Sequence, residues 1–323
     1  MRHLYVVAAL TAIVLAAIPV IAAAQSYPAK PIRIIVPFPP GAFNDTLGRT
    51  IAAKFSDGGF GQAVVDNRPG AGSTIGADLA AKSPPDGYTL LIVAVPFAVN
   101  ATLYTRLPYN TERDFAPILF AGSTPNMLVV HPSLPVKSVQ ELVALAKARP
   151  GQLDYASTGA GSSNHMSMEL FKMMTKTDIL HVPYKGSAPA LTDLMGGHVM
   201  MIFDNTPNVL PHVKTRRMRG IAVTSLRRSA LAPEMPTVDE SGVPGYEVLV
   251  WFGVVGPAGI PREIVAKLNT EINRILQLPD VRERFQAGGV DPVGGPAEKF
   301  GEHLKTEIAK WGRVVKATGA RVD

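Results

Sequence analysis

The chain has 323 residues, no cysteine and a formal net charge of +6 at pH 7. Without cysteine, a disulfide framework, a catalytic thiol and a cysteine-based metal site are all excluded. The basic residues are scattered except for clusters at 214–219 and 227–228. No aromatic residue lies within either cluster, so the composition does not favour nucleic-acid binding.

The first 24 residues are predicted to be a cleavable signal peptide. A short basic start precedes a nearly continuous apolar run over residues 4–24, and the alanines at 22–24 fit a small-residue cleavage site. The run approaches the length of a membrane-spanning helix, so a membrane anchor is the alternative. Pro19, the alanine-rich end and the lack of a basic segment after it favour cleavage and export.

A strand, a stiff loop and a helix are predicted next. The β-branched run at 32–36 is typical of a buried strand, and the prolines and glycine at 37–41 end it. Asn44 and Asp45 are good N-cap residues for a helix whose apolar face begins at Leu47. The start of a helix presents free backbone N–H groups and the positive end of a dipole. We therefore expect this loop to bind an anion, such as a carboxylate.

Further strands and helices alternate after this helix. A short strand is predicted at 62–66 and a strongly apolar one at 88–95. The glycines between 70 and 76 are spaced one residue too wide for a dinucleotide-binding fingerprint, so we interpret them as a tight turn before a helix that ends at Ala81. This alternation favours a mostly parallel sheet.

Two segments are predicted to cross between domains. Apolar runs at 117–120 and 126–130 form the first crossing, and the apolar strand at 247–255 forms the return. The boundaries that follow are residues 25–124 and 246–323 for domain 1, and 125–245 for domain 2. The C-terminal helices are expected to pack on domain 1. Ser138 and Ser187 are predicted to be helix N-caps within domain 2.

A second small-residue loop, at 155–165, also precedes a helix. Glycines alternate with hydroxyl side chains in it, and neither this loop nor the first carries an arginine at its tip. We therefore expect a carboxylate to be held by N–H groups of the first loop, with Ser162, Ser163 and His165 opposing it. Lys185 is placed at the rim of the site.

A serine hydrolase that uses Ser162 and His165 is the alternative function. The loop lacks a Gly-x-Ser-x-Gly elbow, and a serine close to a histidine in sequence does not establish contact between their side chains. The seven histidines are dispersed, with no pair at ligand spacing near carboxylates. We therefore expect no catalytic residue, no metal site and no cofactor.

An ordered set of short motifs covers nearly the whole mature chain. They are VPFPPG at 36–41 with Asp45, NRPGAG at 67–72, PDGYTL at 85–90, YASTGAGS at 155–162 with His165, HVPYKG at 181–186, FDN at 203–205, WFG at 251–253 and PAG at 257–259. Together they resemble the Bug family, the exported solute receptors of tripartite tricarboxylate transporters.

This resemblance implies an α/β periplasmic-binding-protein fold of the second type, with two domains joined by two crossing strands and a ligand cleft between them. It implies a periplasmic, non-enzymatic receptor, expected here as a monomer, for a small carboxylate. Its partners would be the integral-membrane subunits of a transporter, with no nucleic acid involved.

The resemblance also suggests which residues face the ligand. They are Phe38, Pro40, Gly41, Ala42, Phe43, Asn44 and Asp45 in the first loop, Thr158, Gly159, Gly161, Ser162, Ser163 and His165 in the second, and Asp204. Asp204 matches a position that can meet an amino or hydroxyl group of the ligand. The family usually has two glycines after the prolines, whereas Ala42 and Phe43 follow Gly41 here. Backbone donors do not encode the identity of the ligand, which stays open.

Overall fold

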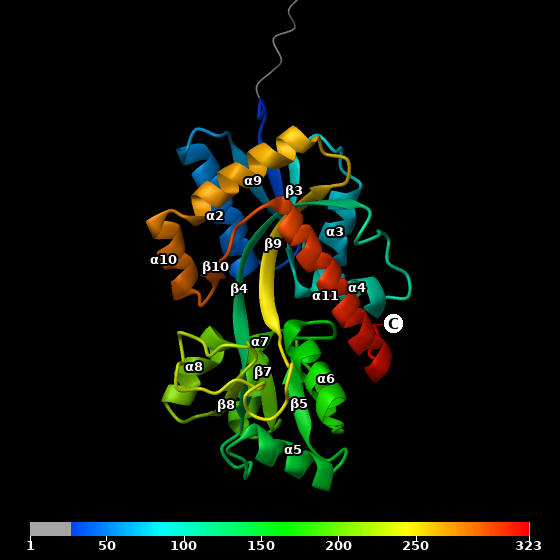
Figure 1. Cartoon of the computed structure of the whole chain (residues 1–323), viewed down its shortest axis with the longest axis vertical. Coiled ribbons are helices and arrows are strands. Elements are labelled where there is room, and N and C mark those ends of the chain that lie inside the picture. Colours follow the sequence, from blue (N-terminus) through cyan, green and yellow to red (C-terminus); the bar gives the residue numbers. More distant parts are fainter. Residues whose placement is uncertain (1–26, 323) are drawn as a thin grey trace, which may run out of the picture.

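Two lobes share one mixed sheet in the computed structural model, which describes residues 27–322 (Figure 1). The strand order is β2-β1-β3-β9-β4-β7-β5-β6, and β8 and β10 each pair with β4. Two long strands, β4 (Phe115–Val130) and β9 (Leu249–Pro257), connect the lobes. The predicted signal peptide lies outside the described residues. Across residues 27–322, no helix combines the length and apolarity that a membrane span requires.

The first lobe contains the parallel strands β1 (Ile32–Val36), β2 (Ala63–Asn67) and β3 (Thr89–Ala94). One face is covered by α2 (Phe43–Asp57), α9 (Arg262–Leu276) and α10 (Pro279–Ala287), and the other by η1 (Ala71–Ser73), α3 (Thr74–Ala81), α4 (Val95–Leu103) and α11 (Ala297–Thr318). Ile34 belongs to the core beneath α2 and α9, whereas Ile35 belongs to the core beneath α3 and α4. Helices on both faces explain why the strands are apolar throughout.

The second lobe repeats this layering. Its parallel strands are β5 (Asp154–Ser157), β6 (Leu180–Pro183) and β7 (Met201–Asn205), and β8 (Arg219–Val223) is antiparallel to β4. Its helices are α5 (Val139–Ala148), α6 (Ser163–Thr175), α7 (Ser187–Gly196) and α8 (Thr206–Lys214). The loops that follow β5, β6 and β7 lead to the N-termini of α6, α7 and α8, which brings those helix starts to one edge of the sheet.

The crossing strands differ from the prediction in two ways. The apolar runs at 117–120 and 126–130 are one strand, and both β4 and β9 run antiparallel to their neighbours. Pairing extends from Phe115 opposite Pro257 to Pro125 opposite Leu249, with register shifts after Pro117 and Phe120. Gly122 and Pro125 suggested a break, but pairing with β9 keeps the segment extended across it.

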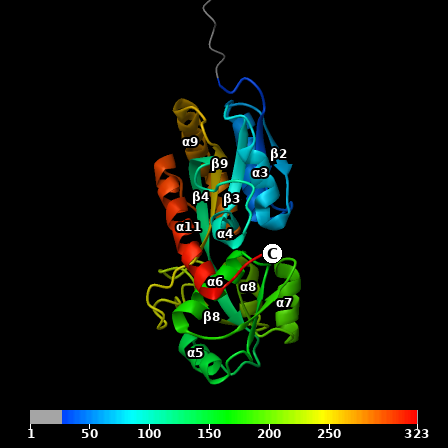
Figure 2. The same ribbon diagram turned by 90° about the vertical axis from the view of Figure 1, so that its right-hand side faces the viewer.

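The long helix α11 runs beside the crossing strands (Figure 2). It contacts α4 and β4 of the first lobe and also α6 of the second lobe. A single helix therefore touches the two lobes and the strands that join them.

The predicted helix caps are correct for α5 and wrong for α2. Ser138 caps α5 as predicted: its hydroxyl accepts a hydrogen bond from the N–H of Glu141 at 3.2 Å. The predicted caps of α2 are wrong, because the helix begins at Phe43 with Ala42 as its N-cap. Asp45 lies inside the first turn, and its carboxylate accepts hydrogen bonds from Gly41, Arg49 and Asn67.

Ser187 is also not an N-cap. Helix α7 begins at Ser187 itself, after Gly186, whose φ of 115° lies in a region that favours glycine. The hydroxyl of Ser187 donates to the Asp204 carboxylate instead. The Ser187 hydroxyl therefore bonds to a side chain on β7 and does not cap the start of α7.

Candidate functional site

A cavity of about 210 Å³ lies between the lobes. It is lined by Phe38, Ala42, Phe43, Asn44, Ala94, Val95, Pro96, Thr158, Ser162, Ser163, Asn164, Ser187, Asp204, Asn205, Asn208, Val250 and Phe252. The N-termini of α2 and α4 reach it from the first lobe, and those of α6, α7 and α8 from the second. Helix N-termini carry partial positive charge, so this arrangement creates a field that favours an anion.

Asp45 holds the first loop from behind. One carboxylate oxygen accepts from the backbone N–H of Gly41 at 3.1 Å and from Arg49 at 2.9 Å, and the other accepts from Asn67 at 2.9 Å. Burial acts to raise the pKa of Asp45, but the hydrogen bonds from Arg49, Asn67 and Gly41 hold it below its usual value. Gly41 has a φ of 91°, which a side chain would disfavour. The loop is therefore fixed by groups that do not line the cavity.

The second loop is fixed by its own hydroxyl groups. Ser162 donates to the carbonyl of Gly159 at 2.7 Å and accepts from the backbone N–H of His165 at 3.3 Å, which makes it the N-cap of α6. Thr158 donates to the side-chain oxygen of Asn164 at 2.7 Å. The amide of Asn164 then donates to the carbonyl of Phe203 at 2.7 Å, which ties the loop to β7.

His165 does not line the cavity. Its ring is buried, and its Nδ1 accepts from the backbone N–H of Gly161 at 3.1 Å. The Ser162 hydroxyl contacts the main chain of His165 and not its ring. The two side chains therefore lack the nucleophile–base hydrogen bond that the hydrolase alternative requires.

Free backbone donors meet at the cavity from both lobes. Across residues 27–322, the N–H groups of Phe43 and Asn44 on α2 and of Ser163 and Asn164 on α6 have no hydrogen-bond partner. Within the part of the chain that the structure describes, no lysine, arginine or histidine lines the cavity. An anion bound here would be held by main-chain dipoles, which is the arrangement found at helix N-terminal anion sites.

Asp204 is the one ionisable side chain among the cavity-lining residues. It is 2% exposed, and its carboxylate accepts from the Ser187 hydroxyl, from the N–H of Asn205 at 2.7 Å and from Asn208 at 3.2 Å. Burial raises the pKa of Asp204 to about 6, although the hydrogen bonds from Asn205 and Asn208 oppose the shift. Asp204 therefore places a titratable acceptor in a site otherwise dominated by donors.

One wall of the cavity is apolar. The ring of Phe43 packs against Phe252 at a centroid distance of 4.5 Å and against Phe285 at 4.9 Å. Phe38 and Val250 also line the cavity. The bulky residue that departs from the usual double glycine is thus part of an aromatic cluster at the first lobe.

The predicted site residues divide into two groups. Phe38, Ala42, Phe43, Asn44, Thr158, Ser162, Ser163 and Asp204 line the cavity, whereas Pro40, Gly41, Asp45, Gly159, Gly161 and His165 lie elsewhere in the same loops. Sequence reasoning missed Ala94, Val95, Pro96, Asn164, Ser187, Asn205, Asn208, Val250 and Phe252. Asn208 was detectable as the residue one helical turn after Asp204, and Pro96 as a proline in a first helical turn. Lys185 does not line the cavity.

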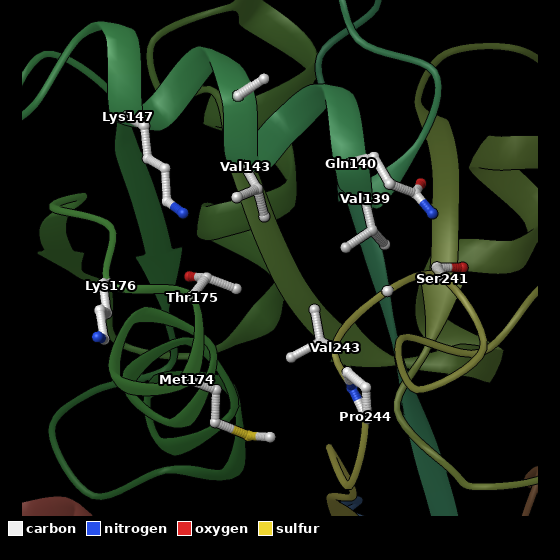
Figure 3. A pocket seen from close by; sticks show the side chains of 12 residues that line it. Val139, Gln140, Val143, Lys147, Met174, Thr175, Lys176, Ser241, Val243 and Pro244 are labelled. Atoms are coloured by element: carbon white, nitrogen blue, oxygen red, sulfur yellow. The ribbon is translucent and has the colours of Figure 1, made fainter.

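Other regions offer less. A larger cavity of about 670 Å³ lies between α5, the end of α6 and the segment 241–244. Figure 3 shows Lys147 and Lys176 on one side of it and Val139 and Pro244 on the other. None of the predicted site residues lines it, and it lies within the second lobe, so lobe closure would not enclose a ligand there. Among the described residues, no cluster of histidine and carboxylate side chains could hold a metal ion.

A family profile described as the tripartite tricarboxylate transporter family receptor matches residues 48–320. The chain belongs to this receptor family. Protein BugT of Bordetella pertussis is 40% identical to the receptor over 301 residues, which cover 93% of this chain and 92% of BugT. The predicted family is thereby confirmed.

Solved structures of similar receptors agree with this assignment. R. palustris Rpa4515 with adipate is 39% identical, with a TM-score of 0.80, and covers 91% of this chain and 98% of its own. The periplasmic binding protein BugD is 30% identical, with a TM-score of 0.78, and the match covers 91% of this chain and 99% of BugD. MatC of Rhodopseudomonas palustris with bound malate is 29% identical, with a TM-score of 0.78, and the match covers 90% of this chain and 100% of MatC. The two-domain binding-protein fold is confirmed, and the receptor is a solute-binding protein and not an enzyme.

Proposed function

We propose that the receptor captures one small carboxylate in the cavity between its lobes and delivers it to a tripartite tricarboxylate-type membrane transporter. The observation that carries this proposal is the set of four free N–H groups at Phe43, Asn44, Ser163 and Asn164, in a cavity without cationic side chains. The carboxylates bound by two similar receptors, adipate and malate, support it.

The cellular setting is part of the same proposal. Residues 1–24 act as a signal peptide, and the mature receptor works as a monomer in the periplasm. Domain 1 comprises residues 25–124 and 246–323, and domain 2 comprises 125–245. These limits fall within β4 and just before β9, so a change in the angle between the lobes requires bending of the two connecting strands and a shift in the contact between α11 and α6.

The free donors explain how an anion is held without an ion pair. Helices α2 and α6 begin on opposite lobes, so one carboxylate that accepts from both helps to hold the lobes together. Hydrogen bonds to an ionised group contribute roughly 1.5–3 kcal/mol each. Loss of one such donor should therefore weaken binding by about tenfold or more.

Proline at the first position of α6 tests this directly. Ser163 has helical backbone geometry, and Ser162 before it has φ −66° and ψ 161°, which a following proline tolerates. Ser163→Pro therefore deletes one N–H at little conformational cost, whereas Ser163→Ala keeps it.

A ligand is first identified by mass spectrometry of the purified receptor and by a thermal-shift screen of di- and tricarboxylates, amino acids and aromatic acids.

Calorimetry with that ligand then compares the two variants. We expect Ser163→Pro to weaken binding by about tenfold or more and Ser163→Ala by less than about threefold. Ala297→Pro at the first position of α11, away from the cavity, should bind normally. Binding that tolerates Ser163→Pro but collapses with Lys185→Ala would show that the site is a conventional ion pair and the proposal is wrong.

A further inference from the structure

A stack of three aromatic rings lies behind the second loop. The ring centroids of His165 and His181 are 4.3 Å apart, and those of Tyr155 and His181 are 4.9 Å apart. The rings come from α6, β6 and β5, so the stack joins three elements of the second lobe. None of the three rings lines the ligand cavity.

His165 acts on the loop as a hydrogen-bond acceptor. The N–H of Gly161 donates to its Nδ1 at 3.1 Å, so this nitrogen carries no proton. An imidazolium has a proton on both ring nitrogens and accepts nothing. Protonation of His165 at Nδ1 would therefore place two N–H groups face to face and break the contact that holds Gly161.

His181 reaches the same loop through Ser157. Its Nε2 lies 2.6 Å from the Ser157 hydroxyl oxygen, which accepts from the N–H of Gly159 at 3.1 Å. Ser157 is fully buried, and within residues 27–322 its hydroxyl has no acceptor other than His181. The satisfied arrangement is therefore Ser157 donating to an unprotonated Nε2, which requires His181 to be neutral.

Together these bonds leave only some loop N–H groups for a ligand. Those of Gly159 and Gly161 are occupied within the loop, whereas those of Ser163 and Asn164 stay free at the cavity. The loop conformation that frees the second pair is the one in which the first pair is bound. The stacked histidines thus hold the N–H groups of Gly161, directly, and of Gly159, through Ser157, in this loop conformation.

We infer that His165 and His181 are positioning residues, which hold the second loop in its anion-binding conformation only while both rings are neutral. This inference rests on the proposed function, because it concerns the donors that the second loop contributes to that site. Neither histidine touches the ligand.

Burial and, to a smaller extent, the charged neighbours determine when the two rings stay neutral. On α6, Glu169 accepts from the Tyr155 hydroxyl at 2.7 Å and from Lys172 at 2.8 Å, so its charge is largely neutralised. Burial, followed by the neighbouring His181, lowers the pKa of His165 to about 4, although Glu169 acts in the opposite direction. Burial likewise lowers the pKa of His181. The loop therefore keeps its shape at neutral pH and loses it in acid.

Two substitutions at His165 distinguish the role of its Nδ1 as a hydrogen-bond acceptor from the role of its ring in the stack. The oxygen of His165→Asn can occupy the place of Nδ1 and accept from Gly161, whereas His165→Phe keeps the stack and removes the acceptor. Measured by calorimetry at pH 7 with the ligand identified above, His165→Phe should weaken binding by about tenfold and His165→Asn by less than about threefold. His181→Phe and His181→Gln form a second pair for the Ser157 contact, should a variant at 165 fail to fold.

A pH series adds a test that simple destabilisation would not pass. Between pH 7 and pH 3.7, wild-type affinity should fall about threefold more than the affinity of His165→Asn. Protonation of the ligand and of Asp204 is common to both proteins and cancels in the ratio. Equal pH profiles, or equal affinities for the Phe and Asn variants, would overturn the inference. If Ser163→Pro still abolishes binding in that case, only the role of the histidines is wrong. If Ser163→Pro has no effect, the proposed site itself is wrong.

Discussion

Trp251 on β9 and Trp311 on α11 donate their indole N–H groups to the same carboxylate oxygen of Glu307, each at 2.8 Å. Both indoles are fully buried and Glu307 is 6% exposed. Trp251 stands opposite Ser123 in the pairing of the two crossing strands. Glu307 therefore fastens the long C-terminal helix to the strands that connect the lobes.

Removal of this carboxylate should destabilise the whole protein. In Glu307→Ala both indole N–H groups lose their acceptor, and each unpaired buried group costs about 1–3 kcal/mol. We expect the free energy of unfolding to fall by about 2–5 kcal/mol, measured by urea denaturation followed by circular dichroism. Glu302→Ala, which removes an exposed carboxylate on the same helix, should change it by less than about 0.5 kcal/mol. Similar values for the two variants would contradict this reading.

Packing between β9 and α11 leaves no room for a methyl group at Gly253. A Cβ at that position would lie 2.1 Å from the ring of Phe300. Gly253→Ala should therefore cost about 1–3 kcal/mol of stability or more. Gly301→Ala is the matched control on α11, because its Cβ would lie 3.4 Å from Pro117 and it removes a glycine from a helix interior. It should gain about 0.5–1 kcal/mol, and denaturant midpoints of the two variants on the same side of wild type would refute the comparison.

Asp204 should make stability depend on pH in an unusual direction. Its folded-state pKa of about 6 lies above the ordinary value of 3.8, so the folded protein binds this proton more tightly than the unfolded chain. The stabilisation is fully present below about pH 4 and is lost as pH rises through 6. Relative to Asp204→Asn, wild type should gain about 2.4 kcal/mol between pH 7.5 and pH 4. Denaturant titrations of wild type and Asp204→Asn at both pH values check this, and parallel pH profiles for the two proteins would contradict it.

The same carboxylate should discriminate between ligands. At pH 7 an ionised Asp204 attracts an ammonium or hydroxyl group and repels a second carboxylate. Asp204→Asn should therefore weaken an amino-acid ligand by about tenfold or more, and should change a plain dicarboxylate little or improve it. Calorimetry with one ligand of each kind decides the matter. Equal losses for both would show that Asp204 acts only on the fold.

Much of the architecture was predictable because it rests on local patterns. The β-branched run of β1 and the spacing of apolar residues in α9 and α11 identify strands and helices directly. The continuity of β4 was not predictable, since Gly122 and Pro125 interrupt the pattern and only pairing with β9 overrides them. Ser187 illustrates the same limit, because its hydroxyl is drawn to a carboxylate on another strand.

The site was predictable where it follows the chain and not where it depends on packing. Ala42, Phe43 and Asn44 immediately follow a strand and a stiff loop, so their position close to a helix start was predictable, although the predicted caps lie two to three residues after the observed one. Phe252 reaches the cavity from a strand distant in sequence, and no local pattern indicates this. The stack of His165 on His181 likewise exists only once α6 and β6 lie side by side.

The sequence contains two tryptophans, and both lie against Glu307 beside the strands that connect the lobes. Bending of those strands would change the surroundings of both indoles at once. The receptor therefore carries a pair of natural fluorophores beside the strands that connect its lobes, and we expect their emission spectrum to change with the angle between the lobes, with no added label. Stopped-flow recording of that emission would give the rates at which the lobes close on a ligand and reopen, and hence how long a ligand stays bound.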